Sequence, residues 1–317
     1  MIPIDVSNVM TACVLAFVAS AVVAPGVYRL LKRVGSRQKI SEHIGEHAHK
    51  EGTPTMGGLI VLLALLAVFI LVPFHDGLVP AVLLLGFAFI GLLDDFIVPR
   101  LANGARGLGW KQKLGLQILV TVGACWLGGV RDWQAMAVIV FFILFFANAF
   151  NISDGMDTLA GGLGVLMALG FGVIALLVSY APAAILMAAL AGAMLPFLFL
   201  NAPPAKLFMG DVGALPIGAL LGWAFLVVGR SSEIYPAHQN LWAASIIAGV
   251  MAIELVPVPL QILSAKLRGG KRLFPKTPLH HGLQEAGWPE TRVVWTFHLV
   301  QAVLVLAGLA VVLGVGR

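Results

Sequence analysis

The sequence predicts an all-α integral membrane protein, a single polytopic domain over residues 1–317 with ten transmembrane helices. Hydrophobic residues make up 60% of the chain and charged residues only 11%, whereas soluble domains carry about 25% charged residues. The mean hydropathy is +0.97. No long polar segment interrupts the apolar stretches, so no separate soluble domain is expected.

The ten spans follow from length, because a helix needs about 20 apolar residues to cross the hydrocarbon. They are expected near residues 8–31, 54–73, 78–98, 113–129, 133–150, 157–179, 182–201, 212–229, 240–266 and 292–314. An even number of spans places both termini on one side. Arg29, Lys32 and Arg33 come after the first apolar stretch, whereas a signal peptide has its charges before it. We therefore expect a retained first helix.

The distribution of Lys and Arg predicts the orientation. Seventeen of the 20 cationic residues lie near the loops 29–53, 98–113, 201–212 and 266–292. Cytoplasmic loops of membrane proteins carry this excess of positive charge. These four loops are therefore expected in the cytoplasm, with both termini outside. The chain shows no nucleic-acid-binding motif, and anionic lipid accounts for much of the basic pI of about 9.4.

Five aspartates stand at the predicted cytoplasmic ends of the spans. They are Asp94, Asp95, Asp154, Asp157 and Asp211. Ionised residues at the edge of hydrocarbon are costly and mark functional sites. Carboxylates gathered on one face of a bilayer indicate a Mg²⁺ site and phosphate chemistry.

Asp94 and Asp95 are adjacent in GLLDDF. Neighbouring positions of an α-helix point about 100° apart. The sequence therefore predicts that one carboxylate enters the site while the other orients its neighbours, unless both belong to a solvated helix end.

A polar turn is predicted in NAFNISDGMD, where Asn148, Asn151, Asp154 and Asp157 recur every third residue. Gly155 is expected to break the helix there. Such a turn could hold a metal or bind ribose, base or phosphate, or could serve only as an Asx-rich cap.

Asp211 precedes an apolar stretch in FMGDVGAL. It is either a metal ligand or an N-cap, and Gly210 and Gly213 would allow a phosphate to approach the backbone. A second anion site is expected in KEGTPTMGG, where Thr53, Thr55 and the N–H groups of a helix start come together.

His280 and His281 follow five cations in the last predicted cytoplasmic loop. A histidine there can donate to phosphate or exchange protons near neutral pH. Glu254 lies inside the ninth span, before Pro257 and Pro259, which are expected to kink the helix. The kink would line a groove for a lipid tail, or Glu254 would be paired within the bundle.

Eight segments occur in order along nearly the whole chain: GTPTMGG, GLLDDF, GLGWKQK, NAFNISDGMDTLAGG, FMGDVGALPIG, LRGGKRLF, PLHHG and GWPETRVVWTF. Together they resemble the phospho-N-acetylmuramoyl-pentapeptide transferases of the polyprenyl-phosphate N-acetylhexosamine-1-phosphate transferase superfamily. GTPTMGG and the final loop favour the muramoyl branch.

The resemblance implies a multi-pass enzyme of the bacterial inner membrane with ten helices, often a homodimer. It implies Mg²⁺-dependent transfer of phospho-MurNAc-pentapeptide from UDP-MurNAc-pentapeptide to undecaprenyl phosphate at the cytoplasmic face. The products would be UMP and lipid I, an intermediate of peptidoglycan synthesis. The resemblance also implies that membrane lipid surrounds the enzyme.

The resemblance also assigns roles to residues of this chain. The catalytic group would be Asp94, Asp95, Asp211 and His280, and the metal ligands would be Asp211 and Asp154. The substrate-binding group would be Lys50, Thr55, Lys113, Asn148, Asn151, Asp154, Gly155, Asp157, Asn201, Phe208 and His281. We expect direct attack by the lipid phosphate, because its second pKa near 6 leaves it mostly deprotonated at pH 7.

Three other functions stay open at this point. A sister transferase would use UDP-GlcNAc or another UDP-HexNAc. An ion-coupled transporter would carry acidic residues at mid-membrane, where only Glu254 is expected. An inactive homologue is a third alternative, because Gly282 stands where the family usually has a third consecutive histidine.

Overall fold

The computed structural model describes residues 5–35, 52–73, 75–101, 107–231 and 236–314, and these residues form helices and no strand. The first helices are α1 (Val6–Val34), α2 (Gly58–Leu71), α3 (Leu78–Leu92), the π-helical segment η2 (Leu93–Ile97), α4 (Val98–Leu101), α5 (Trp110–Leu127), α6 (Trp133–Ser153) and α7 (Leu159–Leu177). The others are α8 (Ala181–Asn201), α9 (Asp211–Arg230), α10 (Ala237–Ile247), α11 (Gly249–Leu255), α12 (Pro257–Leu267), α13 (Leu279–Glu285) and α14 (Glu290–Val312).

The helices confirm a membrane protein. Within the described ranges, 8 helices are long and apolar enough to cross a bilayer. Two of the ten predicted spans fall outside this group. The α2 helix is apolar but has only 14 residues, and α5 carries Lys111, Lys113 and Gln117 in its first turns. The count of ten and the orientation therefore stay predictions.

Helix α9 forms the centre of the bundle and packs against α3, α6, α7 and α10. Small residues make this close packing possible, because they let helix backbones approach one another. A Cβ added to Gly218 of α9 would lie 2.5 Å from the carbonyl oxygen of Phe146, and one added to Gly213 would lie 2.5 Å from the Cα of Gly58. Gly213 therefore serves the contact between α9 and α2, which differs from the predicted role in phosphate approach.

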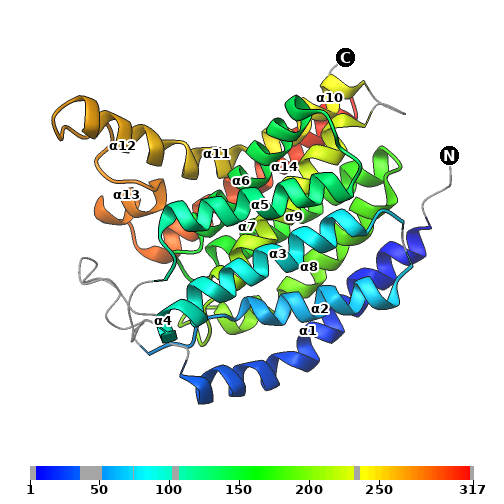
Figure 1. Ribbon diagram of the computed structural model, residues 1–317, viewed down its shortest axis with the longest axis horizontal. Coiled ribbons are helices and arrows are strands. Elements are labelled where there is room, and N and C mark those ends of the chain that lie inside the picture. Colours follow the sequence, from blue (N-terminus) through cyan, green and yellow to red (C-terminus); the bar gives the residue numbers. More distant parts are fainter. Residues whose placement is uncertain (1–4, 36–51, 74, 102–106, 232–235, 315–317) are drawn as a thin grey trace.

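The bundle has two distinct ends (Figure 1). Helix α1 begins and α14 ends at the same end, on the right of the view. The α4 helix lies at the opposite end, on the left, where α3 runs into η2. That opposite end carries the acidic residues described below, and we call it the aspartate end.

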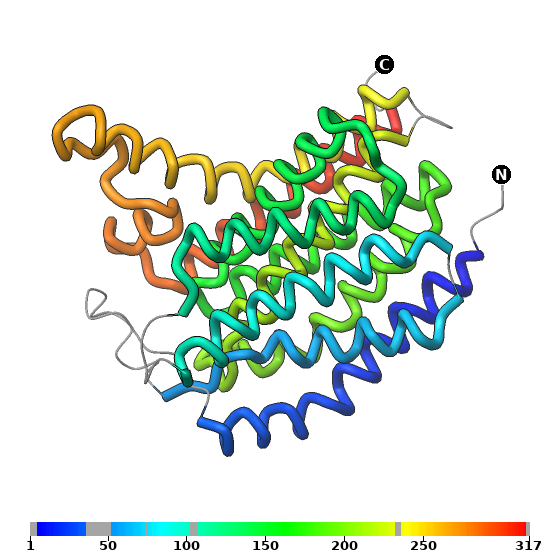
Figure 2. Tube along the Cα trace, in the orientation of Figure 1, coloured from blue at the N-terminus to red at the C-terminus, as the bar shows by residue number. Residues whose placement is uncertain are grey.

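The predicted ninth span, residues 240–266, is not one helix. It is divided into α10, α11 and α12, with breaks at Ala248 and Val256. Pro257 begins α12, where the prolines were expected to kink the helix, and α11 and α12 together form one of the 8 candidate spans, Gly249–Leu267. The break at Ala248 was not expected. Figure 2 shows α11 and α12 leaving the bundle as an arm, from which the chain folds back to α13.

Candidate functional site

Three carboxylates converge at the aspartate end. Oxygen atoms of Asp94, Asp95 and Asp211 all lie within 4.8 Å of one another. Asp94 and Asp95 come from the π-helical segment η2, and Asp211 is the first residue of α9. The expectation that only one of the adjacent aspartates enters the site was wrong. The α-helical turn gives way to a wider π turn here, a feature that often occurs at functional sites.

Lys113 and Asn151 bind this acidic cluster. The Lys113 ammonium lies 2.9 Å from the Asp94 carboxylate and also forms an ion pair with Asp211. The Asn151 amide donates to the other oxygen of Asp211, over 2.7 Å. Four elements therefore meet at the cluster: η2, α5, α6 and α9.

Backbone groups fix both aspartates of η2. Asp94 accepts from the N–H of Leu108 at 2.6 Å, and Asp95 accepts from the N–H of Val212 at 3.0 Å. Gly210 has a φ of 70°, and a Cβ there would lie 2.6 Å from the Asp95 carboxylate. Only glycine meets both conditions without strain, so Gly210 lets the chain turn tightly against Asp95.

The turn between α6 and α7 brings Asp154 beside the cluster. Burial, followed by the negative charge of Asp211, raises the pKa of Asp154 well above the usual carboxyl value, although a hydrogen bond from the N–H of Gly210 lowers it. Burial therefore has the largest effect on this carboxyl, and the charge of Asp211 adds to it. A bound cation would favour the charged form of the carboxyl.

Asp157 and Asn201 hold the adjoining loops together. The buried Asp157 carboxylate accepts from the N–H of Ala205 at 3.0 Å. The buried Asn201 side chain accepts from the N–H of Thr158 at 2.8 Å and donates to the carbonyl of Leu207 at 2.9 Å. Both residues therefore order the chain segments on either side of the cluster, and neither belongs to the converging triad.

His280 lies over the same turn. Its ring and its backbone N–H both bind the carboxylate of Glu254, and both residues are fully buried. A Cβ added to Gly155 would lie 2.9 Å from the Nε2 of His280 and 3.6 Å from the Nε2 of His281. Gly155 thus leaves the space that the two imidazoles need.

Thr55 and Phe208 lie where residues 54–58 pair with residues 208–209. Phe208 donates its N–H to Pro54, and the N–H groups of Gly57 and Gly58 donate to Phe208 and Met209. The backbone N–H groups at this helix start were predicted to bind an anion. That prediction is wrong for Gly57 and Gly58, because their N–H groups already donate to backbone carbonyls. Thr55 is buried, and its hydroxyl would lie 2.7 Å from a Cβ at Gly210.

Asn148 does not join the cluster. Asn148 donates to the side chain of Gln117 at 2.8 Å and to the carbonyl of Leu144 at 2.7 Å. Gln117 lies one turn beyond Lys113 along α5, so this pair fixes α5 against α6. Lys50 lies outside the described residues.

Glu254 was not among the predicted site residues. Its position within an apolar span was a signal, because buried acids in membrane proteins are paired. The partner could not be identified from the sequence alone, since 26 residues separate Glu254 from His280. The alternative of a glutamate paired within the bundle is the one that the structure supports.

A cavity of about 490 Å³ adjoins the turn that carries Asp154. Its size is within the range of about 300–1,000 Å³ that is common for ligand pockets. The lining includes Asp157, Thr158, Ala205, Glu290 and His298. The cavity therefore has the size and the polar groups to take part of a substrate.

The donor set of the cluster suits a divalent metal ion. Mg²⁺ prefers hard oxygen ligands and is held by a few carboxylates together with substrate phosphates. Asp94, Asp95 and Asp211 offer such oxygens within 4.8 Å of one another. Asp154, predicted as a metal ligand, lies close enough to Asp211 for its pKa to respond but is not part of that triad.

Comparisons with known proteins identify the family. The profile of glycosyl transferase family 4 matches residues 77–229. Signature 1 of the phospho-N-acetylmuramoyl-pentapeptide-transferases matches residues 50–62. The first match includes Asp94, Asp95, Lys113, Asn151 and Asp211.

Curated relatives extend the match over nearly the whole chain. The phospho-N-acetylmuramoyl-pentapeptide-transferase of Halalkalibacterium halodurans is 35% identical over 92% of this chain and 95% of its own length. The enzyme of the same name from Pelotomaculum thermopropionicum is 36% identical over 96% of this chain and 98% of its own length. The enzyme of the same name from a Picosynechococcus species is 37% identical over 87% of this chain and 80% of its own length. The chain therefore belongs to the phospho-N-acetylmuramoyl-pentapeptide-transferase family.

Proposed function

We propose that this protein transfers phospho-MurNAc-pentapeptide from UDP-MurNAc-pentapeptide to undecaprenyl phosphate, releasing UMP and forming lipid I. The observation that carries the proposal is the convergence of Asp94, Asp95 and Asp211 on Lys113 and Asn151 in a member of this family. The reaction would take place at the cytoplasmic face of the bacterial inner membrane, with ten helices crossing the bilayer and both termini outside. A homodimer is the proposed assembly.

The reaction exchanges one phosphoanhydride for another. An oxygen of the lipid phosphate forms a bond to the phosphorus next to the sugar. The bond from that phosphorus to the bridging oxygen breaks, and UMP leaves with the electron pair. Because the attacking phosphate is already mostly deprotonated at pH 7, the reaction needs charge neutralisation between two anionic substrates more than it needs a strong base.

The residues of the cluster are suited to that task. Lys113 supplies positive charge between Asp94 and Asp211. Asn151 fixes the orientation of Asp211, and the N–H of Val212 fixes Asp95. Asp94 would orient the lipid phosphate. Mg²⁺, held by Asp211 with Asp94 and Asp95, would supply Lewis-acid charge stabilisation to the phosphate oxygens.

The remaining predicted residues would bind the nucleotide and the sugar phosphate. Asp157 and Thr158 line the cavity of about 490 Å³ at the turn between α6 and α7, which we assign to part of the UDP-linked substrate. His280 and His281 would donate to phosphate oxygens. The other predicted residues would bind substrate directly or order the loops that surround it. They are Lys50, Thr55, Asn148, Asp154, Gly155, Asn201 and Phe208.

Gly282 does not argue against activity. A Cβ added there would meet only the carbonyl of Lys276, at 3.3 Å, within 4 Å among the described neighbours outside its own helix. A larger side chain would therefore fit at this position. His280 and His281 remain, so we expect activity to survive without the third histidine.

The test is UMP release by the purified protein in detergent, with UDP-MurNAc-pentapeptide, undecaprenyl phosphate and Mg²⁺. Release that EDTA abolishes and Mg²⁺ restores would support the proposal. A parallel reaction with UDP-GlcNAc tests the sister function. Release only with UDP-GlcNAc would assign the chain to that function, and no release with either substrate would contradict both.

A further inference from the structure

The bundle contains a second cavity, at the end away from the aspartates. It has a volume of about 350 Å³ and lies between the outer ends of α3, α5, α6 and α9. Val79 of α3 lines it, and fifteen residues of helix, about 22 Å, separate Val79 from Asp94. The cavity is therefore a different site from the aspartate cluster.

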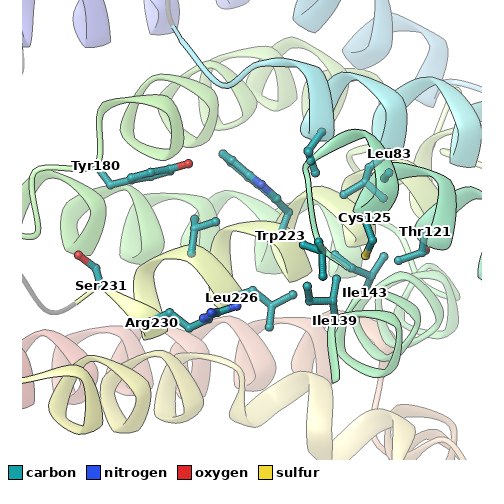
Figure 3. Close-up of a pocket in the computed structure, with 15 residues that line it drawn as sticks. Leu83, Thr121, Cys125, Ile139, Ile143, Tyr180, Trp223, Leu226, Arg230 and Ser231 are labelled. Atoms are coloured by element: carbon teal, nitrogen blue, oxygen red, sulfur yellow. The ribbon is translucent and has the colours of Figure 1, made fainter. Parts of the chain in front are cut away.

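The lining of this cavity is polarised (Figure 3). Tyr180, Ser231 and Arg230 lie on one side. The other side carries apolar side chains, among them Leu83, Cys125, Ile139 and Ile143. Trp223 and Leu226 lie between the two sides. A ligand that matches this lining has a polar head at one end and an aliphatic segment at the other.

Arg230 determines which charge the polar head of the ligand should carry. It is the only ionisable residue other than Tyr180 and Cys125 in the described lining, which contains no carboxylate. No hydrogen bond or ion pair of its guanidinium is formed with the described residues. Arg131, another cation at this end, already has partners. Its guanidinium lies 4.3 Å from the centroid of the Trp126 ring and donates to the Trp126 carbonyl at 2.7 Å. Arg230 is therefore the cation available to an anionic group.

Asp76 limits where that anion can lie. It is close enough to Tyr180 to raise the pKa of the phenol, after the larger effect of burial. An anion is consequently repelled from the Tyr180 side and favoured beside Arg230 and Ser231. The Tyr180 ring, whose centroid is 6.3 Å from that of Trp223, belongs to an aromatic pair typical of the membrane interface.

We propose that this cavity binds an anionic glycerophospholipid, with the phosphate beside Arg230 and one acyl chain along Leu226, Ile139 and Ile143. Chain burial alone gives little selectivity, because lipid tails are as apolar as the leucines around them. The headgroup charge therefore decides which lipid is retained. A cation near the membrane surface contributes about 1 kcal/mol, roughly a five-fold preference for an anionic lipid.

The substrate lipid is a poor match for this cavity. Under the proposed function its phosphate must reach the aspartate end, about 22 Å of helix away. The lipid proposal rests on the cavity and on Arg230, not on the transferase function. It stands or fails independently of UMP release.

Native mass spectrometry of the full-length protein in detergent tests the proposal. Phosphatidylglycerol and phosphatidylethanolamine with identical chains are added in equal amounts, and bound lipid is counted for the wild type, Arg230→Gln and Arg131→Gln. We expect a preference of roughly five-fold for phosphatidylglycerol in the wild type and in Arg131→Gln, and none in Arg230→Gln. Val227→Phe, which fills the cavity, is expected to lower retention of both lipids.

Several outcomes would overturn the proposal. One is equal retention of both lipids by the wild type. Another is an unchanged preference in Arg230→Gln, which would place the anionic lipid elsewhere. Displacement of phosphatidylglycerol by inorganic phosphate would assign the site to a free anion, and stoichiometric displacement by undecaprenyl phosphate would assign it to the polyprenyl lipid. Thermal unfolding of each variant verifies that loss of lipid does not reflect loss of fold.

Discussion

The carboxylate of Glu254 binds both the backbone N–H and the imidazole Nδ1 of His280, although 26 residues separate the two along the chain. Both side chains are fully buried. The Nε2 of His280 has no hydrogen-bond partner among the described residues and faces the turn at Gly155. Glu254 therefore orients the ring so that Nε2 is directed at the turn that adjoins the aspartate cluster.

Glu254→Gln is expected to lower kcat for UMP release by about 10- to 100-fold, the usual effect of losing a residue that orients a functional histidine. KM should change little, because the substrate contacts remain. Glu285→Gln, on α13 and exposed, is the matched control. Equal kcat in both variants would exclude a positioning role.

Asp211→Asn is expected to lower turnover by at least about 100-fold, because charge stabilisation at phosphate depends on this carboxylate. The Mg²⁺ concentration for half-maximal activity should rise for any residual turnover. Asp76→Asn makes the same change at the other end of the bundle, at a φ of 57° that asparagine tolerates. Retained activity in a folded Asp211→Asn protein would remove Asp211 from the proposed metal ligands.

Gly155→Ala is expected to lower turnover by roughly 100-fold, because its Cβ would displace the His280 ring. The distance from that Cβ to Nε2 would be only 2.9 Å. Gly123→Ala, on α5, adds a methyl group with nothing within 4 Å and should leave activity unchanged. Measurements of kcat and of the thermal unfolding midpoint distinguish the two. A fully active Gly155→Ala protein would contradict the close packing of His280 on this turn.

Gly282→His restores the family pattern and is expected to change activity by no more than about two-fold, which corresponds to roughly 0.5 kcal/mol in the barrier. A Cβ at this position would meet only the carbonyl of Lys276, at 3.3 Å, so the substitution should not displace His280 or His281. Steady-state UMP release gives the answer. A gain of ten-fold or more would show that the third histidine takes part in the reaction.

Gly58→Ala is expected to destabilise the protein by about 1–3 kcal/mol, the usual cost of overpacking. Its Cβ would lie 2.2 Å from the Cα of Gly213, where α2 and α9 meet. Gly26→Ala in α1 meets nothing within 4 Å and should be neutral or slightly stabilising. Thermal unfolding in detergent compares the two, and an unchanged midpoint in Gly58→Ala would contradict the contact.

Much of the fold could be predicted because the bilayer imposes a local requirement. A segment in hydrocarbon must satisfy its own backbone hydrogen bonds, so each long apolar stretch becomes a helix. The stretch 240–266 did not become one helix as predicted. The helix breaks at Ala248, where no proline indicates a break in the sequence. The residues of the candidate site were also identifiable, because aspartates are costly at helix ends next to hydrocarbon.

The sequence by itself determined the helices, the membrane class and the candidate acidic residues, since composition and periodicity act over one or two turns of chain. Only the tertiary structure decided how those residues meet. The π turn brings Asp95 to the same point as Asp94, Lys113 joins Asp94 to Asp211, and Glu254 orients His280. These contacts depend on helix packing between distant segments, for which a local pattern contains no information.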